Sequence, residues 1–324
     1  MQHIIVTPED SDQRLDRYLR KLFPNAPLSF LYKMGRTKKV RLNGKKAEPE
    51  MRILEGDEIS LYLSDVEIGE FGEKKAVHIE RLERFDPTSI LFEDEMLLVV
   101  NKPAGVNVHP GDHKTTEVSL IELIQDYLGN RYNSTGWKPS LAHRLDRDTS
   151  GALIIAKSRH VLNAILEELQ SDKITKIYLA CTAGIPLEKS GRTNAPLLRI
   201  EDAKNENKVR IDPAGAKAVT YYHVLASNVE RHLGLLELRL ETGRMHQIRV
   251  HLASLHCPVI GDKAYGDPQA NRDAEKQQAI HRQLLHARRL EFTHPISKKR
   301  LRIEAPVPVD MQNFMNASLL FISE

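Results

Sequence analysis

A run of nine residues, 143–151, sets strong charge directly beside apolar segments. Its sequence is His-Arg-Leu-Asp-Arg-Asp-Thr-Ser-Gly, and the apolar residues 152–156 follow it. The pattern places the charges where a buried strand begins, and residues 149–151 have the composition of a turn. Buried carboxylates are costly unless they are paired. Asp146, with an arginine on either side, is therefore either part of a structural ion-pair loop or a catalytic group.

Basic residues concentrate near the N-terminus, although the whole chain has a formal net charge of only +3. Between positions 14 and 46 there are eleven Lys and Arg residues and one acid, Asp16, so this window carries +10 and the remainder −7. Clustered cations bind phosphates more effectively than dispersed ones. The window therefore predicts a polyanionic partner, with a solvated charged face as the alternative.

Length and composition limit the class of protein. The chain has 324 residues, 41% of them apolar, which is enough for two domains with a sizeable core. Cys181 and Cys257 are 76 positions apart, so a thiolate metal site or a disulfide framework is not expected. No apolar signal core or run of about 18 apolar residues is present. We expect a cytoplasmic protein that does not enter a membrane.

Residues 1–70 predict a compact module of two short helices and a hairpin. The first helix is expected to begin after Ser11 or Asp12 and to end before Pro24, with leucines on one face and basic residues on the other. A second helix should follow residues 27–29. The Asn-Gly pair at 43–44 is a strong hairpin signal.

The next segment, 64–76, is acidic, contains glycine and is only weakly periodic, which is typical of a linker between domains. We therefore predict a domain over 1–70, a linker over 71–88 and a second domain over 89–324. In the second domain, apolar patterning predicts strands over residues 96–100, 176–180, 218–225 and 234–240. It predicts helices over residues 120–128 and 158–171.

A second charged cluster occupies residues 240–252, where a strand is expected to turn into a helix. The first turn of that helix is predicted to present Arg244, His246, Gln247 and Arg249. Helix N-termini and arginines both suit phosphate. A metal site is disfavoured, because His246 and His251 are five positions apart and a two-histidine site on a helix needs four.

Three motifs together resemble the RluA family of RNA pseudouridine synthases: residues 143–151, Lys176-Ile177-Tyr178, and residues 242–251. The likeness extends from Arg14 to about Pro308. It also takes in the shorter motifs at 101–105, 108–111, 258–262, 265–266 and 285–287. Met245 departs from the family, which usually has Thr or Ser there. Residues 14–19, 40–45 and 55–57 resemble the αL RNA-binding domain, whereas the second helix, at 30–34, lacks its usual basic face.

The resemblance implies an α+β fold: a mixed, mainly antiparallel sheet flanked by helices, preceded by a small αL-type RNA-binding domain. It also implies an isomerase that needs no cofactor and no metal. Asp146 is then the essential carboxylate, Arg249 its ion-pair partner, and Tyr178 the stacking partner of the target base. The remaining residues implied to bind RNA or substrate are Arg144, Ile248, His246, Arg14, Arg17, Lys38, Lys39 and Lys45.

The expected substrate is structured RNA, most often large-subunit ribosomal RNA in family members with this N-terminal module, and the enzyme is expected to be a monomer. The alternatives are a transfer-RNA synthase, a non-catalytic RNA-binding or ribosome-assembly factor, and a metal-dependent hydrolase. Residues 267–283 are polar and helix-prone, and we expect an insertion there, near the site. The segment 106–111 is expected to be a loop beside it.

Overall fold

The computed structural model describes residues 1–71, 84–110, 117–132, 137–201 and 207–320. The chain divides into two compact units, and each is described by itself. The first unit comprises Met1–Phe85, Leu123–Ser140 and Lys157–His160, and the second comprises Asp86–Glu122, Leu141–Ala156 and Val161–Glu324. Most of the predicted linker over 71–88, and the end of the predicted loop over 106–111, lie outside the described residues. The domain boundaries at 70 and 88 stay a prediction.

The N-terminal part of the first unit contains a four-stranded sheet in the order β1-β6-β3-β4. Its elements are β1 (Gln2–Ile5), β2 (Gln13–Arg14), α1 (Leu15–Leu22), α2 (Leu28–Arg36), β3 (Val40–Leu42), β4 (Lys45–Lys46), β5 (Arg52–Ile53), β6 (Glu58–Leu61) and α3 (Asp65–Phe71), with a 3-10 turn at Pro8–Asp10. The predicted hairpin is confirmed: Asn43 and Gly44 join β3 to β4 with φ values of 49° and 73°. Buried side chains of α1, α2 and β6 form one core.

The first helix begins later than its sequence predicted. Gln13 and Arg14 stay extended, because β2 pairs with β5. The N–H groups of Leu15 and Asp16 donate to the carbonyls of Met51 and Pro49, both at 2.8 Å. Those backbone bonds satisfy donors that a helix end leaves free, so α1 begins without a side-chain cap from Ser11 or Asp12.

The expectation of a linker from residue 64 was wrong for its first part. Residues Asp65–Phe71 form α3, and Ile68 and Phe71 pack against the core of the first unit. The Phe71 ring lies 4.4 Å from that of Phe30, centroid to centroid. Two apolar residues three positions apart lie on one face of a helix, so they can attach this short helix to the core although the segment is otherwise acidic and contains glycine.

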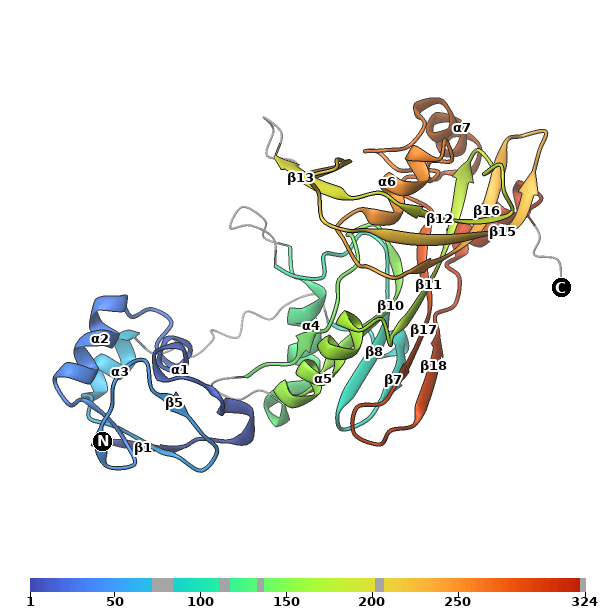
Figure 1. Cartoon of the computed structure of the whole chain (residues 1–324). Helices are drawn as coiled ribbons and strands as arrows, with labels where there is room; N and C mark the ends of the chain where they lie inside the picture. The colour runs from blue at the N-terminus through green and yellow to red at the C-terminus, as the bar shows by residue number, and fades with distance from the viewer. Residues whose placement is uncertain (72–83, 111–116, 133–136, 202–206, 321–324) are drawn as a thin grey trace. The chain divides into compact units, whose positions relative to one another are not determined.

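The second unit is built on a ten-stranded sheet in which β12-β15-β16-β11-β17-β10-β8-β7 are successive neighbours. Only the pairing of β10 with β17 is parallel among the pairings described. The predicted mixed, mainly antiparallel sheet is confirmed (Figure 1). Its strands are β7 (Ile90–Glu93), β8 (Leu97–Lys102), β9 (Ser140–Leu141), β10 (Ser150–Ala156), β11 (Thr175–Ala183), β12 (Ser190–Asn194), β15 (Val219–Asn228), β16 (Leu233–Leu240), β17 (Leu285–Thr293) and β18 (Arg300–Glu304), and a separate hairpin consists of β13 (Leu197–Glu201) and β14 (Asn207–Ile211).

Helices cover parts of this sheet (Figure 1). Val161 and Ile165 pack on β8, β10 and β17, whereas Met311 and Phe314 pack on β11 and β16. After α3, the helices of the described residues are α4 (Leu120–Leu128), α5 (Arg159–Gln170), α6 (Gln247–Ser254), α7 (Pro268–Gln278) and α8 (Val309–Ala317), with 3-10 turns at Pro87–Ser89 and Gly129–Arg131. Most of α4 belongs to the first unit. Among the described residues no helix combines the length and apolarity needed to cross a membrane.

Candidate active site

The charged run at 143–151 forms the connection from β9 into β10. The turn itself differs from the prediction: the N–H of Thr149 donates to the carbonyl of Asp146 at 3.1 Å, so the turn spans Asp146–Thr149. Ser150 and Gly151 already belong to β10. Gly151 has φ 117°, and a Cβ there would lie 2.3 Å from the carbonyl oxygen of Ala287 in β17. Glycine is therefore required where the turn enters the sheet.

Lys102 holds this turn through the hydrogen bonds of its side chain. Its side chain is fully buried at the end of β8, and Nζ donates to the carbonyls of Pro103, Val106 and Arg147 at 2.7, 2.9 and 2.7 Å. Burial lowers the pKa of Lys102 to about 7, against the opposing charge of Asp148. From the sequence, Lys102 is only one residue of the short motif at 101–105. Its role depends on carbonyls from two separate loops, which only the fold brings together.

Two neutral histidines form hydrogen bonds with residues of β10, the strand that follows the turn. His143 Nε2 accepts a hydrogen bond from the N–H of Ile154 at 3.2 Å, and His286 Nδ1 lies 2.9 Å from the hydroxyl of Ser150. His286 is fully buried, and its Nε2 faces the carbonyl of Ala305. Burial lowers the pKa of both histidines to about 4. His143 therefore ties the loop to β10 through the backbone of Ile154.

These two histidines predict acid destabilisation. Their folded pKa values of about 4 lie below the ordinary 6.5, so the unfolded chain binds more protons in between. The free energy of unfolding should be fully maintained above pH 6.5 and should fall from there toward pH 4, by up to about 1.4 kcal/mol per pKa unit and histidine. Urea titrations at pH 7.5, 6 and 5 measure this slope. His286→Gln should reduce it, and an equal slope in that variant would contradict the assignment.

Asp146 forms an ion pair with Arg249 of α6, and both residues line one pocket. Arg249 Nη1 donates to Asp146 Oδ2 at 3.0 Å, so these residues, 103 positions apart, form the expected ion pair. The other side of the guanidinium binds Asp262, with Nε to Oδ2 at 2.7 Å and Nη2 to Oδ1 at 2.8 Å. Asp262 has no exposed side-chain surface. Such a two-pronged contact fixes the orientation of Arg249 relative to Asp146.

The charges of this triad support one another. Burial lowers the pKa of Arg249, but the hydrogen bonds and charges of Asp262 and Asp146 outweigh it, so the pKa is raised overall. Burial raises the pKa of Asp262, and Arg249 with two backbone N–H groups more than reverses this. Arg249 therefore stays a cation beside Asp146. Sequence reasoning missed Asp262, which it had noted only as the last residue of a motif.

The pocket around Asp146 has apolar walls and a cationic rim. Tyr178 of β11 and Ile248 of α6 line it and are buried, and Leu285 of β17 joins them. Burial, and then the charge of Asp146, raise the pKa of Tyr178, so its hydroxyl stays protonated. Arg144 also lines the pocket and is exposed. Asp146, Tyr178, Arg249, Ile248 and Arg144 are thus brought together, whereas their roles in catalysis stay a prediction.

The start of α6 differs from its prediction. The helix begins at Gln247, because His246 adopts a left-handed conformation with φ 54°, and Arg244 precedes the helix. Gln247 is buried. Its Oε1 accepts hydrogen bonds from the hydroxyl of Thr242 and the N–H of Arg244, and its Nε2 donates to the carbonyl of Val219 and the hydroxyl of Thr220 in β15. His246 lines the pocket, with Nε2 3.9 Å from Asp146 Oδ2. His251 is buried and bonded to Thr220 and the carbonyl of Ala195.

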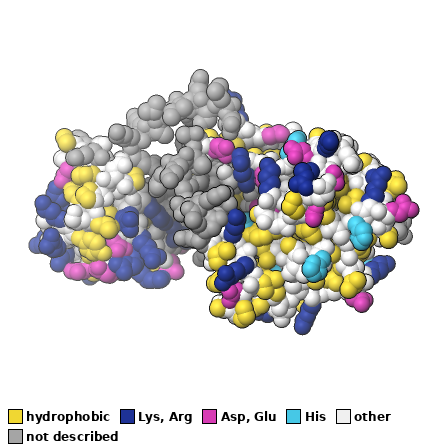
Figure 2. Space-filling model, turned by 90° about the horizontal axis from the view of Figure 1, so that it is seen from above, with side chains coloured by type: hydrophobic (Ala, Val, Ile, Leu, Met, Phe, Trp, Pro, Cys, Tyr) yellow, Lys and Arg dark blue, Asp and Glu magenta, His cyan; other side chains and the backbone are white. Residues whose placement is uncertain are grey.

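The predicted RNA contacts of the first unit fall into two groups. Arg17, Lys38 and Lys45 are exposed. Arg14 is bound to Asp16 at 2.7 Å, and Lys39 is bound to Glu67 of α3. Figure 2 shows many further Lys and Arg side chains on the visible surface of this unit. The first three side chains are thus exposed and the other two are paired with carboxylates, and the contact of all five with RNA stays a prediction.

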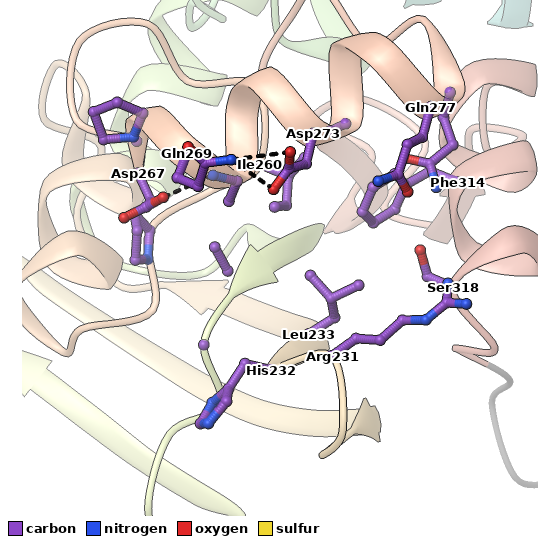
Figure 3. Close-up of a pocket in the computed structure, with 18 of the residues that line it drawn as sticks. Arg231, His232, Leu233, Ile260, Asp267, Gln269, Asp273, Gln277, Phe314 and Ser318 are labelled. Carbon is purple, nitrogen blue, oxygen red and sulfur yellow. Dashed lines mark hydrogen bonds between the residues drawn. The ribbon is translucent and has the colours of Figure 1, made fainter.

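A second cavity, with a volume of about 980 Å³, lies elsewhere in the second unit. In Figure 3, Gln269, Asp273 and Gln277 of α7 face Arg231 and His232 from the turn between β15 and β16. The helix in the predicted insertion at 267–283 therefore lines this cavity and not the Asp146 pocket. Only the end of that segment reaches the turn at Asp146–Thr149, where Gln283 Nε2 donates to Thr149 Oγ1 at 2.8 Å. Across the described ranges no three His, Cys, Asp or Glu side chains are placed to hold a metal ion.

Comparison with known proteins gives this fold and pocket a family. A model described as RNA pseudouridylate synthase matches residues 96–254. The chain is 35% identical over 303 residues to the ribosomal large subunit pseudouridine synthase C of Buchnera aphidicola subsp. Baizongia pistaciae, covering 93% of this chain and 92% of that protein. It is 37% identical over 279 residues to a Bacillus subtilis protein named uncharacterized RNA pseudouridine synthase YhcT, covering 85% and 83%.

The solved structure of human RNA pseudouridylate synthase domain containing 4 is similar with a TM-score of 0.59 at 26% identity, covering 73% of this chain and 95% of that one. The chain belongs to the RNA pseudouridine synthase family. It is an RNA pseudouridine synthase, an isomerase that converts uridine to pseudouridine. The family and the names of these relatives do not favour the alternatives of a transfer-RNA synthase, a non-catalytic RNA-binding factor and a metal-dependent hydrolase.

Proposed function

We propose that this enzyme isomerises uridines in large-subunit ribosomal RNA and that Asp146 is its catalytic carboxylate. The observation that carries the second part is the pocket in which Asp146 Oδ2 meets Arg249 while Tyr178 and Ile248 form apolar walls. The first part is supported by relatives of 33–35% identity that are named for the large ribosomal subunit. The same proposal has the enzyme act as a monomer in the cytoplasm.

The reaction is a rearrangement in which no atom is gained or lost. The bond from the sugar's anomeric carbon to ring nitrogen 1 breaks, the uracil turns, and the same sugar carbon joins ring carbon 5. Carbon 5 loses a proton and nitrogen 1 gains one. The protein must supply an ionised carboxylate close to sugar and base, surfaces that hold the detached uracil, and shelter from water.

Each lining residue suits one of these tasks. Arg249, held by Asp262, keeps Asp146 oriented. Tyr178 and Ile248 are placed to hold the uracil between them, since aromatic and apolar faces stack on bases. A stacked uridine cannot reach such a pocket, so it must be flipped out at a cost of a few kcal/mol. Arg144 at the exposed rim is suited to grip the backbone or fill the vacated space.

Tyr178→Phe should keep turnover within about tenfold of the wild type, because the stacking ring remains and only the hydroxyl is lost. Tyr178→Leu should lose more, since it removes the flat face. Single-turnover rates on a saturating RNA transcript measure both. Complete loss in the phenylalanine variant would instead assign proton transfer to the hydroxyl.

The first unit is proposed to bind the RNA backbone through its exposed cations. Replacing Arg17, Lys38 and Lys45 with alanine should lower affinity and reduce the slope of log affinity against log salt by up to about three. A control that removes the same charge from the second unit, at Lys299, Arg300 and Arg302, should leave the slope unchanged. Equal slopes in both triple variants would mean that the first unit is not the phosphate anchor.

Release of tritium from uracil-labelled transcripts tests the substrate. Large-subunit ribosomal RNA fragments should release tritium and transfer RNAs should not. Turnover on transfer RNA alone would replace the proposed substrate, and release from neither would contradict the proposal.

A further inference from the structure

His246 lies between Asp146 and Tyr265, a residue that follows α6 on the loop toward α7. His246 Nδ1 is 2.9 Å from Tyr265 Oη, and Nε2 is 3.9 Å from Asp146 Oδ2. The two rings meet edge to face, with centroids 5.5 Å apart. The ring of His246 therefore connects the Asp146 carboxylate to a phenol hydroxyl outside the pocket lining.

The neighbouring hydrogen-bond donors indicate where the protons on Tyr265 and His246 lie. The backbone N–H of Val209 in β14 donates to Tyr265 Oη at 2.9 Å. The single proton of the hydroxyl is then free for the acceptor beside it, which is His246 Nδ1. Burial lowers the pKa of His246 below its ordinary value despite the charge of Asp146, so the ring is neutral. A neutral imidazole that accepts at Nδ1 carries its proton on Nε2, the nitrogen that faces Asp146.

Tyr265 is itself firmly placed. Its ring lies under the guanidinium of Arg249, with Cζ 5.1 Å from the ring centroid, and its backbone N–H donates to Asp262 Oδ1 at 3.1 Å. The hydroxyl is therefore fixed to the same group of residues that orients Asp146. His246 is fixed from the other side by its left-handed backbone at the start of α6.

We propose that Tyr265 and His246 are positioning residues for Asp146, with Tyr265 selecting the histidine tautomer whose Nε2–H faces the carboxylate. Arg249 then binds the carboxylate from one direction and the imidazole N–H supports it from another. At 3.9 Å the N–H acts as an oriented dipole, and a movement of about 1 Å brings it to hydrogen-bond distance. This inference deepens the proposed function and rests on the role of Asp146 in it.

The tautomer can be observed directly in the intact enzyme. In nitrogen-15 spectra of histidine-labelled protein, His246 should show an unprotonated Nδ1 and a protonated Nε2, with its signals assigned by their absence in His246→Asn. Asparagine suits this site, because it tolerates the left-handed backbone. Tyr265→Phe should move the resonances toward a mixture of tautomers. A wild-type ring protonated on Nδ1 would overturn the inference whatever the activity.

Kinetics supply the second readout. Tyr265→Phe and His246→Asn should each lower kcat about tenfold with KM for RNA unchanged, as expected for the loss of one oriented hydrogen bond. The double variant should be no slower than His246→Asn, because both act through one chain. Tyr221→Phe, which removes a half-buried hydroxyl that donates to Glu241 outside the pocket lining, is the matched control and should keep wild-type kcat.

The outcomes separate this inference from the proposed function. Additive losses in the double variant, or a raised KM with kcat unchanged, would overturn the positioning role. Absence of turnover in the wild-type enzyme would overturn the proposed function, and the nitrogen-15 spectra would still decide the tautomer.

Discussion

Replacing Asp146 with asparagine should lower turnover by at least about 10⁴-fold and leave RNA affinity within about twofold. Asparagine has the volume of aspartate and an oxygen that still accepts from Arg249 Nη1. It lacks the negative charge that the reaction needs beside the sugar and the uracil. Tritium release under single-turnover conditions, together with filter binding of the same transcript, separates the two effects.

Asp172→Asn is the matched control, since Asp172 forms a half-exposed ion pair with Arg239 at 3.5 Å and lies outside the pocket lining. It should keep wild-type turnover. Turnover in Asp146→Asn near that of the control would remove Asp146 from the chemistry, whereas equal loss of RNA affinity and turnover would make it a binding residue.

Arg249→Met should lower the free energy of unfolding by about 3–5 kcal/mol, in addition to abolishing turnover. The methionine fills much of the same space, but it leaves the carboxylate of Asp262 buried without its cation. Urea titration of the purified variant measures the loss. The cost is large because Arg249 links two carboxylates, one fully buried and one in the pocket.

Arg210→Met is the control for this effect, because its ion pair with Asp212 leaves most of the arginine exposed. Exposed pairs contribute about 1 kcal/mol or less. If the two variants were equally stable, the Arg249–Asp262 pair would not hold the site together.

The parts of the site that sequence predicted are those carried by local motifs. Asp146, Tyr178 and Arg249 each lie in a distinctive run of residues. Resemblance to a family implied the ion pair of Asp146 with Arg249, which are 103 positions apart. Hydrophobic periodicity also predicted the strands β8, β11, β15 and β16 and the helices α4 and α5, because it depends on neighbours a few positions apart. The mainly antiparallel sheet followed from the same resemblance.

The parts that sequence missed depend on contacts between distant segments. Lys102 is an anchor only because the turn at Asp146–Thr149 places the carbonyl of Arg147 above it. Asp262 and Tyr265 matter because the loop after α6 folds back beside Arg249. The late start of α1 similarly depends on carbonyls from residues 49–51. No local pattern specifies such partners, since spacing along the chain does not encode them.

The most direct test of the central claim is a nucleotide-resolution map of pseudouridine in total RNA from cells that lack this gene. We predict that one or more sites in large-subunit ribosomal RNA revert to uridine. Expression of the wild-type protein should restore them, and equal expression of Asp146→Asn should not. A map unchanged by loss of the gene, or restored by the asparagine variant, would contradict the proposal that this enzyme modifies ribosomal RNA through Asp146.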